Sequence, residues 1–306
     1  MQNYKLTIDE TFENERLDVV LAGLLENLSR SKIQTLIKNK QIKVNGKEGK
    51  ASYKVLTDDV IEINNIEESV CSKPIPQNIP LDIRYEDDDM LVVNKPSGML
   101  THPTTIEKEN TLVNALLYYT NSNLSILNGE FRAGIVHRLD RNTSGLLMIA
   151  KNDFAYENLK KQIQEKTAIR KYIAVLTGVL NDDEGIIETN FGRHPTKPQK
   201  MAVLDEGKLA ITKYKVLKRF PKNTFVEFEL KTGRTHQIRV HSAYIHHPIV
   251  NDTLYGGEKL KLKTDEQVLQ AYDLTFSRPS DNKIINIKID YDDDIKRTLT
   301  FLENRK

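Results

Sequence analysis

The sequence of 306 residues contains a single cysteine, Cys71. One cysteine excludes an intramolecular disulfide and a zinc cluster built from thiolates. No apolar run approaches the roughly 18 residues that a membrane-spanning helix needs. The N-terminal residues MQNYKLTIDETFENE lack the apolar core and the basic flank of a signal peptide. We therefore expect a cytoplasmic protein that does not bind or span a membrane.

The motifs of several common enzyme classes are also missing. No GxGxxG follows an expected strand, which argues against a Rossmann-type dehydrogenase or methyltransferase. The stretch VHRLDRN resembles a kinase catalytic loop only superficially, because Leu139 separates Arg138 from Asp140 and the chain has no glycine-rich loop and no DFG. GxSxG is absent as well. The residues that remain are a lone carboxylate, several arginines and some tyrosines, which suit a cofactor-free reaction on a polyanion.

Length and hydrophobic periodicity together indicate two domains. A chain of 306 residues exceeds the usual size of one domain. We assign residues 12–66 to an N-terminal domain, residues 67–79 to a proline-containing linker, and residues 80–306 to a second domain. Ser31 and Gln34 have the spacing of a capping box that opens a second N-terminal helix. The first helix has an apolar face formed by Leu17, Val20, Leu21, Leu24, Leu25 and Leu28.

The N-terminal domain carries a concentrated positive charge, although the whole chain has a net charge of only +2. Positions 27–54 hold eight basic residues and one acidic residue, which gives +7. Most charge runs form only a solvated surface, but charges of nearly one sign on two short helices and a hairpin favour a phosphate-binding surface. The basic residues are Arg30, Lys32, Lys38, Lys40, Lys43, Lys47, Lys50 and Lys54.

The second domain is rich in expected strands, at residues 90–95, 145–151, 170–178, 211–217, 223–232 and 283–289. In the segment FVEFELK, Val226, Phe228 and Leu230 alternate with charged residues, which is typical of a half-buried strand in an antiparallel sheet. Helical spacing appears at residues 112–119 and 155–163. Strands and helices do not alternate regularly, so the pattern predicts an α+β fold rather than a doubly wound sheet.

A short connection between two expected strands carries three ionisable side chains, His137, Arg138 and Asp140. An aspartate in a turn usually binds the local backbone, and Asp140 could also simply pair with Arg138. A loop fixed by strands is, however, a place where a rigid scaffold presents a reactive group. Neighbouring arginines keep a carboxylate ionised, which makes Asp140 a candidate nucleophile.

A second polar cluster, at residues 231–257, contains Arg234, Arg239 and four of the seven histidines. Zinc binding is poorly supported, because the segment has no HExxH, no cysteine and no carboxylate at ligand spacing. Binding of phosphate or carboxylate by the two arginines is more economical. A phosphate-handling hydrolase is the alternative that would use the histidines, which are His236, His241, His246 and His247.

Five segments in the same order resemble the RluA/RluD-type RNA pseudouridine synthases, and the resemblance covers nearly the whole chain. The first, RLDVVLAGLLENLSRSKIQTLIKNKQIKVNGK, is similar to an S4 RNA-binding domain. The others are LVVNKPSGMLTHP, VHRLDRNTSGLLMIAK, RKYIAVLTG and TGRTHQIRVHSAYIHHPIVNDTLYGG. The resemblance implies a mixed, mainly antiparallel catalytic domain, and a cofactor-free conversion of uridine to pseudouridine after the target base leaves its stack.

The same resemblance implies roles for individual residues. Asp140 lies in the loop that carries the catalytic aspartate of the family, as the nucleophile or base at the sugar or the uracil. Tyr172 would stack on the uracil, and Arg234 would pair with Asp140 to keep it charged and oriented. Arg138 would fill the space of the flipped base, Ile238 would pack beneath the ring, and His137 would pack or form a hydrogen bond.

The expected binding residues fall into two sets. The substrate-binding set, in which Lys95 shapes the site rather than reacts, is Arg138, Lys95, Ile238 and Arg239. The RNA-binding set of the S4 domain is Arg30, Lys32, Lys38, Lys40 and Lys43.

The combination of S4 and catalytic domains resembles the RluC/RluD branch, which implies 23S ribosomal RNA, free or in a pre-ribosomal particle, as the partner of a monomeric enzyme. Transfer RNA is the alternative substrate, and a catalytically silent ribosome-assembly factor is the alternative function. Two positions depart from the family: Asn39-Lys40 stands where a glycine is common, and Gln270 stands where histidine is frequent. Neither departure touches the expected nucleophile.

Overall fold

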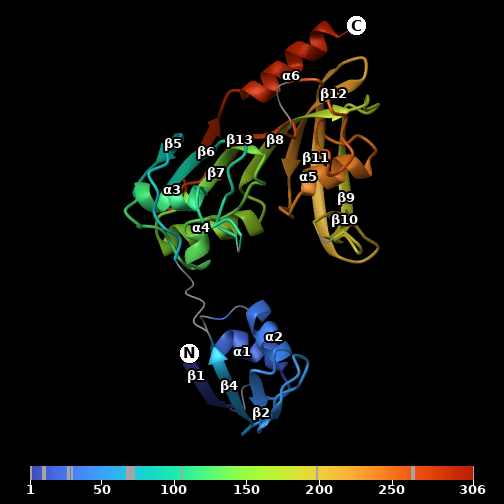
Figure 1. Cartoon of the computed structure of the whole chain (residues 1–306). Coiled ribbons are helices and arrows are strands. Elements are labelled where there is room, and N and C mark those ends of the chain that lie inside the picture. Colours follow the sequence, from blue (N-terminus) through green and yellow to red (C-terminus); the bar gives the residue numbers. More distant parts are fainter. Residues whose placement is uncertain are drawn as a thin grey trace. The chain divides into compact units, whose positions relative to one another are not determined.

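The computed structural model describes residues 2–8, 12–25, 28, 30–66, 73–104, 106–197, 199–262 and 266–305. The chain divides into two compact units, Met1–Ser72 and Lys73–Lys306 (Figure 1). Residues 67–72 of the expected linker, including Cys71, lie outside the described residues. No helix among the described residues is both long enough and apolar enough to cross a bilayer.

The first unit combines two helices with an antiparallel sheet of strand order β1-β4-β2-β3. Leu17, Val20 and Leu21 are buried in its core as their spacing predicts, whereas Leu24, the last residue of its helix, is half exposed. The elements are β1 (Gln2–Thr7), α1 (Leu17–Leu24), α2 (Arg30–Lys38), β2 (Ile42–Val44), β3 (Lys47–Glu48) and β4 (Val60–Ile66).

A buried carboxylate connects the two helices of this unit. Asp18 in α1 has no exposed surface and accepts a hydrogen bond of 2.7 Å from Gln34 Nε2 in α2. Arg16 and Arg30 donate to the same carboxylate at 3.0 Å. The predicted capping box is therefore wrong, because Ser31 lies inside α2 and the Gln34 side chain binds Asp18.

The expected RNA-binding cations lie on the surface of the first unit. Arg30, Lys38 and Lys40 are exposed, and Lys32 and Lys43 are partly exposed. Lys40 takes the left-handed backbone conformation, with φ of 61°. A side chain in this conformation costs about 1 kcal/mol relative to glycine, so a glycine would adopt this backbone conformation with less strain.

We expect the stability of the first unit to fall in acid because of Asp18. Hydrogen bonding from Arg16, opposed by burial and helped by Gln34 and Arg30, holds the pKa of Asp18 below its usual range. A carboxyl whose pKa is lower in the folded state stabilises the fold above its unfolded pKa of about 4, and this stabilisation is lost as the pH falls further. Thermal denaturation from pH 6 to about pH 2 tests this expectation.

The variants that accompany this titration are Asp18→Asn and, as an exposed control, Asp58→Asn. The Asp18→Asn protein should be less stable at neutral pH and should depend less steeply on pH than the wild type. An acid dependence as steep as that of the wild type would contradict the expectation.

The second unit is built on a ten-stranded sheet with the order β10-β9-β11-β12-β8-β13-β7-β6-β5, and β14 pairs with β13 (Figure 1). Among the described strands only β13 and β7 pair in parallel, so the predicted α+β fold with a mixed, mainly antiparallel sheet is confirmed. The strands are β5 (Ile83–Glu86), β6 (Met90–Lys95), β7 (Ser144–Ala150), β8 (Ile169–Thr177), β9 (Glu184–Arg193), β10 (Met201–Val203), β11 (Lys208–Arg219), β12 (Asn223–Leu230), β13 (Leu269–Ser277) and β14 (Ile284–Lys288). The α-helices are α3 (Leu112–Tyr119), α4 (Asp153–Gln164), α5 (Gln237–Tyr244) and α6 (Asp293–Asn304).

The two faces of this sheet carry separate hydrophobic cores. Neighbouring residues of β8 point to opposite faces because side chains alternate along a strand. Ile173 and Val175 pack in the core that includes residues of α4 and α6. Tyr172 and Ala174 pack in the other core, with residues of α3 and with Ile238. The strand alternation therefore places Tyr172 on the face that also receives the Asp140 loop.

Candidate active site

The loop that carries Asp140 enters through a single β-bridge and leaves through β7. Residues Ile135 and Ile149 form only an isolated bridge, so the strand predicted before the loop is absent. On the other side, Gly145 has φ of 118°, and a Cβ there would lie 2.0 Å from the carbonyl oxygen of Ala271. A glycine is required at this point because β7 and β13 approach each other directly after the loop.

Side chains from residues 95–101 hold the backbone of this loop. Thr101 donates to the carbonyl of Leu139 at 2.8 Å. Lys95 Nζ donates at 3.0 Å to the carbonyl of Arg141, the residue after Asp140. Ser97 donates to the next carbonyl, that of residue 142, at 3.1 Å. These three bonds surround Asp140 in the sequence and fix the direction of its side chain.

The Lys95 side chain is buried in the interior and does not line the pocket. Its ammonium donates two further hydrogen bonds, to the carbonyls of Pro96 at 2.7 Å and Met99 at 2.9 Å. Burial lowers its pKa to about 7. Because Lys95 has no exposed surface, its assignment to the residues that contact substrate is wrong, whereas its expected role in shaping the site agrees with these bonds.

Asp140 is paired with Arg239, not with Arg234. Its Oδ2 lies 3.1 Å from Arg239 Nη1. The same guanidinium makes a two-pronged contact with Asp252, through Nε at 2.7 Å and Nη2 at 2.9 Å. Burial alone would lower the pKa of Arg239, but hydrogen bonding to Asp252 raises it. Arg234 instead donates through Nε and Nη2 to the carbonyl of Leu209, so its predicted pairing with Asp140 is wrong in this structure.

His236 stands on the other side of the Asp140 carboxylate. Its Nε2 lies 3.7 Å from Asp140 Oδ2, and its Nδ1 lies 2.9 Å from the Tyr255 hydroxyl. That hydroxyl accepts a bond from Met201 N–H, so its own proton is available to donate to Nδ1. Burial lowers the pKa of His236 despite Asp140. A neutral His236 then carries its proton on Nε2, facing Asp140.

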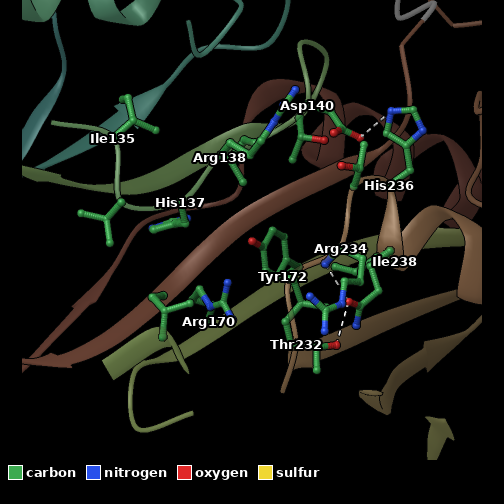
Figure 2. Close-up of a pocket in the computed structure, with 18 of the residues that line it drawn as sticks. Ile135, His137, Arg138, Asp140, Arg170, Tyr172, Thr232, Arg234, His236 and Ile238 are labelled. Carbon is green, nitrogen blue, oxygen red and sulfur yellow. Dashed lines mark hydrogen bonds and ion pairs between the residues drawn. The ribbon is translucent and has the colours of Figure 1, made fainter. Parts of the chain in front are cut away.

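The Asp140 carboxylate opens into a cavity of about 530 Å³. Among the described residues that line it, Asp140 is the only acidic side chain. Tyr172 and Ile238 supply apolar surface, and Figure 2 shows the Tyr172 ring in the central part of the site, below Asp140. Seven lysines and arginines also line the cavity: Arg132, Arg138, Lys166, Arg170, Lys231, Arg234 and Arg239. This composition suits a polyanion that carries a planar group.

His137 has the supporting role that the sequence predicts. Its Nε2 accepts a hydrogen bond of 3.2 Å from the backbone N–H of Met148 in β7. Burial and the charge of Arg170 lower its pKa to about 3, which keeps the ring neutral. His137 therefore attaches the loop to the sheet.

The histidines of residues 231–257 do not gather around one point. His241 is buried between the hydroxyls of Thr189 and Thr212, at 3.0 and 2.8 Å. His247 Nδ1 contacts the carbonyl of Thr177 at 3.0 Å. In the part of the chain that the structure describes, no group of three potential metal ligands comes together.

Sequence reasoning did not single out Asp252, Thr101 or Arg170. Asp252 lies in the quoted segment PIVNDTLYGG, so a search for carboxylates within the family motifs would have found it. Arg170 lies two residues before Tyr172, and strand periodicity would have placed both on one face. Thr101 gave no signal, because its hydrogen bond depends on a contact 38 residues away in sequence. Gln270 binds the backbone of Asp290 and Asp292 and pairs with Ser144 across β13 and β7.

Family models match both units of the chain. The model described as RNA pseudouridylate synthase matches residues 89–244, and the S4 domain matches residues 15–61. A solved structure, human RNA pseudouridylate synthase domain containing 1, is similar with a TM-score of 0.58 over 75% of this chain and 97% of that chain. At 23% sequence identity this likeness shows the fold alone.

Bacterial relatives match over most of the chain. An uncharacterised RNA pseudouridine synthase of Bacillus subtilis is 41% identical, with 96% of both chains covered. Ribosomal large subunit pseudouridine synthase D of Haemophilus ducreyi is 44% identical over 79% of this chain and 73% of the relative. The corresponding protein of Neisseria meningitidis serogroup A is 39% identical over 97% of this chain and 81% of its own. The family model and these relatives together show that the chain belongs to the RNA pseudouridylate synthase family.

Proposed function

We propose that this protein isomerises specific uridines to pseudouridine in large-subunit ribosomal RNA. The observation that carries the proposal is Asp140, the single acidic side chain among the described residues of a strongly basic pocket. The reaction breaks the bond between uracil N1 and ribose C1′ and forms a bond from C5 to C1′. C5 loses a proton and N1 gains one, so no oxidant or cofactor is consumed.

The residues divide into those that meet the substrate and those that support them. Asp140 acts on the nucleotide, and Tyr172 stacks on the uracil, an interaction worth about 1–3 kcal/mol per base. Ile238 packs against the ring, and the exposed Arg138 occupies the space that the flipped base leaves in the RNA. Arg239 is a positioning residue, because it reaches Asp140 from its anchor on Asp252.

Arg234 has a different role in this proposal from the one expected. Its exposed guanidinium lines the cavity while two of its nitrogens donate to Leu209. We therefore assign it to the RNA backbone at the mouth of the pocket, where a cation attracts phosphate without touching the reacting bond.

The choice of large-subunit RNA rests on the relatives named ribosomal large subunit pseudouridine synthase D. We further propose that the protein acts as a monomer in the cytoplasm. The test is a map of pseudouridines in ribosomal and transfer RNA from cells with and without the gene. Loss of one or a few positions in large-subunit RNA is expected. Loss of pseudouridines in transfer RNA alone would make transfer RNA the substrate. An unchanged map would favour a catalytically silent assembly factor.

We expect the basic surface of the first unit to set the salt dependence of RNA binding. Each lysine that contacts a phosphate contributes about 0.7–0.9 to the slope of log affinity against log salt. The triple variant Lys38→Gln, Lys40→Gln and Lys43→Gln should weaken binding and reduce the slope by roughly 2. Filter binding to a large-subunit ribosomal RNA transcript at several salt concentrations measures this slope.

The matched control removes three exposed lysines of the second unit that do not themselves line the pocket. These are Lys160→Gln, Lys283→Gln and Lys296→Gln. An equal reduction of the slope in both triple variants would argue against a specific RNA-binding role of the first unit.

A further inference from the structure

Arg170 is a buried cation on the pocket side of β8. It is 5% exposed and precedes Tyr172 by two residues, so both side chains lie on the same face of the strand. Its guanidinium lines the same cavity as Asp140. In Figure 2, Arg170 and His137 lie on one side of the Tyr172 ring, away from the pair of Asp140 and His236.

No acidic side chain among the described residues forms an ion pair with this charge. The Arg170 Nε atom is buried without a hydrogen-bond partner, and neither of its terminal nitrogens bonds to a described residue. Its resolved electrostatic neighbours are Tyr172 and His137, and neither is an anion at neutral pH. Burial lowers the pKa of Arg170, as expected for a charge without a partner. Leaving a cation in this state is unfavourable unless a ligand completes the site.

The backbone beside Arg170 leaves space for the guanidinium. A Cβ at Gly233 would lie 2.9 Å from Arg170 Nη1, so a larger residue at position 233 would displace it. Arg132 and Lys166 line the same cavity, and the Tyr172 hydroxyl forms no hydrogen bond with a described residue. These cations and the hydroxyl suit an anion with several acceptor oxygens, and in RNA the anionic group is the phosphodiester.

We propose that Arg170, with the Tyr172 hydroxyl, binds a phosphate group adjacent to the flipped uridine. The proposal rests on the proposed function, because it takes the occupant of the pocket to be a nucleotide. A planar guanidinium gives two parallel hydrogen bonds to phosphate oxygens, which would fix the sugar relative to Asp140. Arg170 is then a substrate-binding residue that Tyr172 accompanies on the same strand.

The direct test compares the binding of uridine, 5′-UMP, 3′-UMP and inorganic phosphate to the full-length protein by calorimetry. We expect one of the two nucleotides to bind to the wild type at least about 10-fold more tightly than uridine. The nucleotide that does so shows whether Arg170 binds the 5′ or the 3′ phosphate. Arg170→Met should abolish this preference while uridine affinity stays within about two-fold, and Arg170→Lys should retain part of it. The proposal would be overturned if Arg170→Met lost affinity equally for uridine and both nucleotides. It would also be overturned if the wild type bound neither nucleotide more tightly than uridine. Inorganic phosphate that binds as tightly as either nucleotide, without competing with uridine, would overturn it too.

Thermal stability separates this role from a structural one. Because Arg170 is an unpartnered buried charge, Arg170→Met should leave the melting temperature of the free protein unchanged or raise it. Arg239→Met, which removes a paired arginine from the same pocket, is the matched control and should lower it. A large decrease in the melting temperature of Arg170→Met would overturn the proposal. Failure of the proposed function would appear separately, as wild-type protein that binds nucleotides but forms no pseudouridine in any RNA.

Discussion

Asp140→Asn is expected to fold like the wild type and to form pseudouridine at least about 10⁴-fold more slowly. The amide has nearly the same size as the carboxyl group but acts neither as a nucleophile nor as a base. The scaffold should hold, because Arg239 keeps its two hydrogen bonds to Asp252. Release of tritium from RNA labelled at uridine C5 measures turnover, since that hydrogen leaves when C5 bonds to the ribose.

The control for this variant is Asp88→Asn, an exposed aspartate of the same unit that does not line the cavity. It should match the wild type in turnover and in melting temperature. If the Asp140→Asn protein kept a tenth of the wild-type rate, Asp140 would not be the nucleophile or base of the reaction. A protein that melts far below the wild type would show that the carboxylate also stabilises the fold.

Arg239→Met is expected to destabilise the second unit by about 3–5 kcal/mol and to lower activity severely. The change leaves Asp252 buried without its partner, and Asp252 is 2% exposed. It also removes the group that fixes Asp140. Arg234→Met should cost less than about 1 kcal/mol, because it loses only exposed bonds to one carbonyl. Chemical denaturation of both variants gives the two free energies of unfolding.

This pair of variants tests which arginine supports Asp140. Arg234→Met should raise KM through weaker RNA binding and leave kcat closer to the wild type, whereas Arg239→Met should lower kcat. Arg239→Lys is a further check, since a lysine cannot reproduce the two-pronged contact with Asp252 and should recover little activity. If Arg234→Met proved the more damaging to kcat and stability, the pairing of Asp140 with Arg239 would not describe the working enzyme.

Local patterns in the sequence predict much of the second unit. The alternation of Val226, Phe228 and Leu230 with charged residues predicts β12, and these three side chains are buried as expected. Helix α5 is not predicted, because all of its residues from Gln237 to Ser242 are buried and it shows no polar face. The capping box at Ser31 fails for a related reason. Gln34 binds Asp18, 16 residues away, and that contact overrides the local signal.

The sequence alone, through its motifs, determined the α+β class and the family resemblance, and it predicted Asp140 as the catalytic candidate. The tertiary structure alone decided which arginine reaches it. His236 takes the left-handed conformation, with φ of 58°, and α5 begins at Gln237. Arg234 therefore lies before the helix and turns to Leu209, whereas Arg239 lies in its first turn between Asp252 and Asp140. Two arginines five positions apart look equivalent in a motif. Only the path of the backbone between them decides which of the two contacts Asp140.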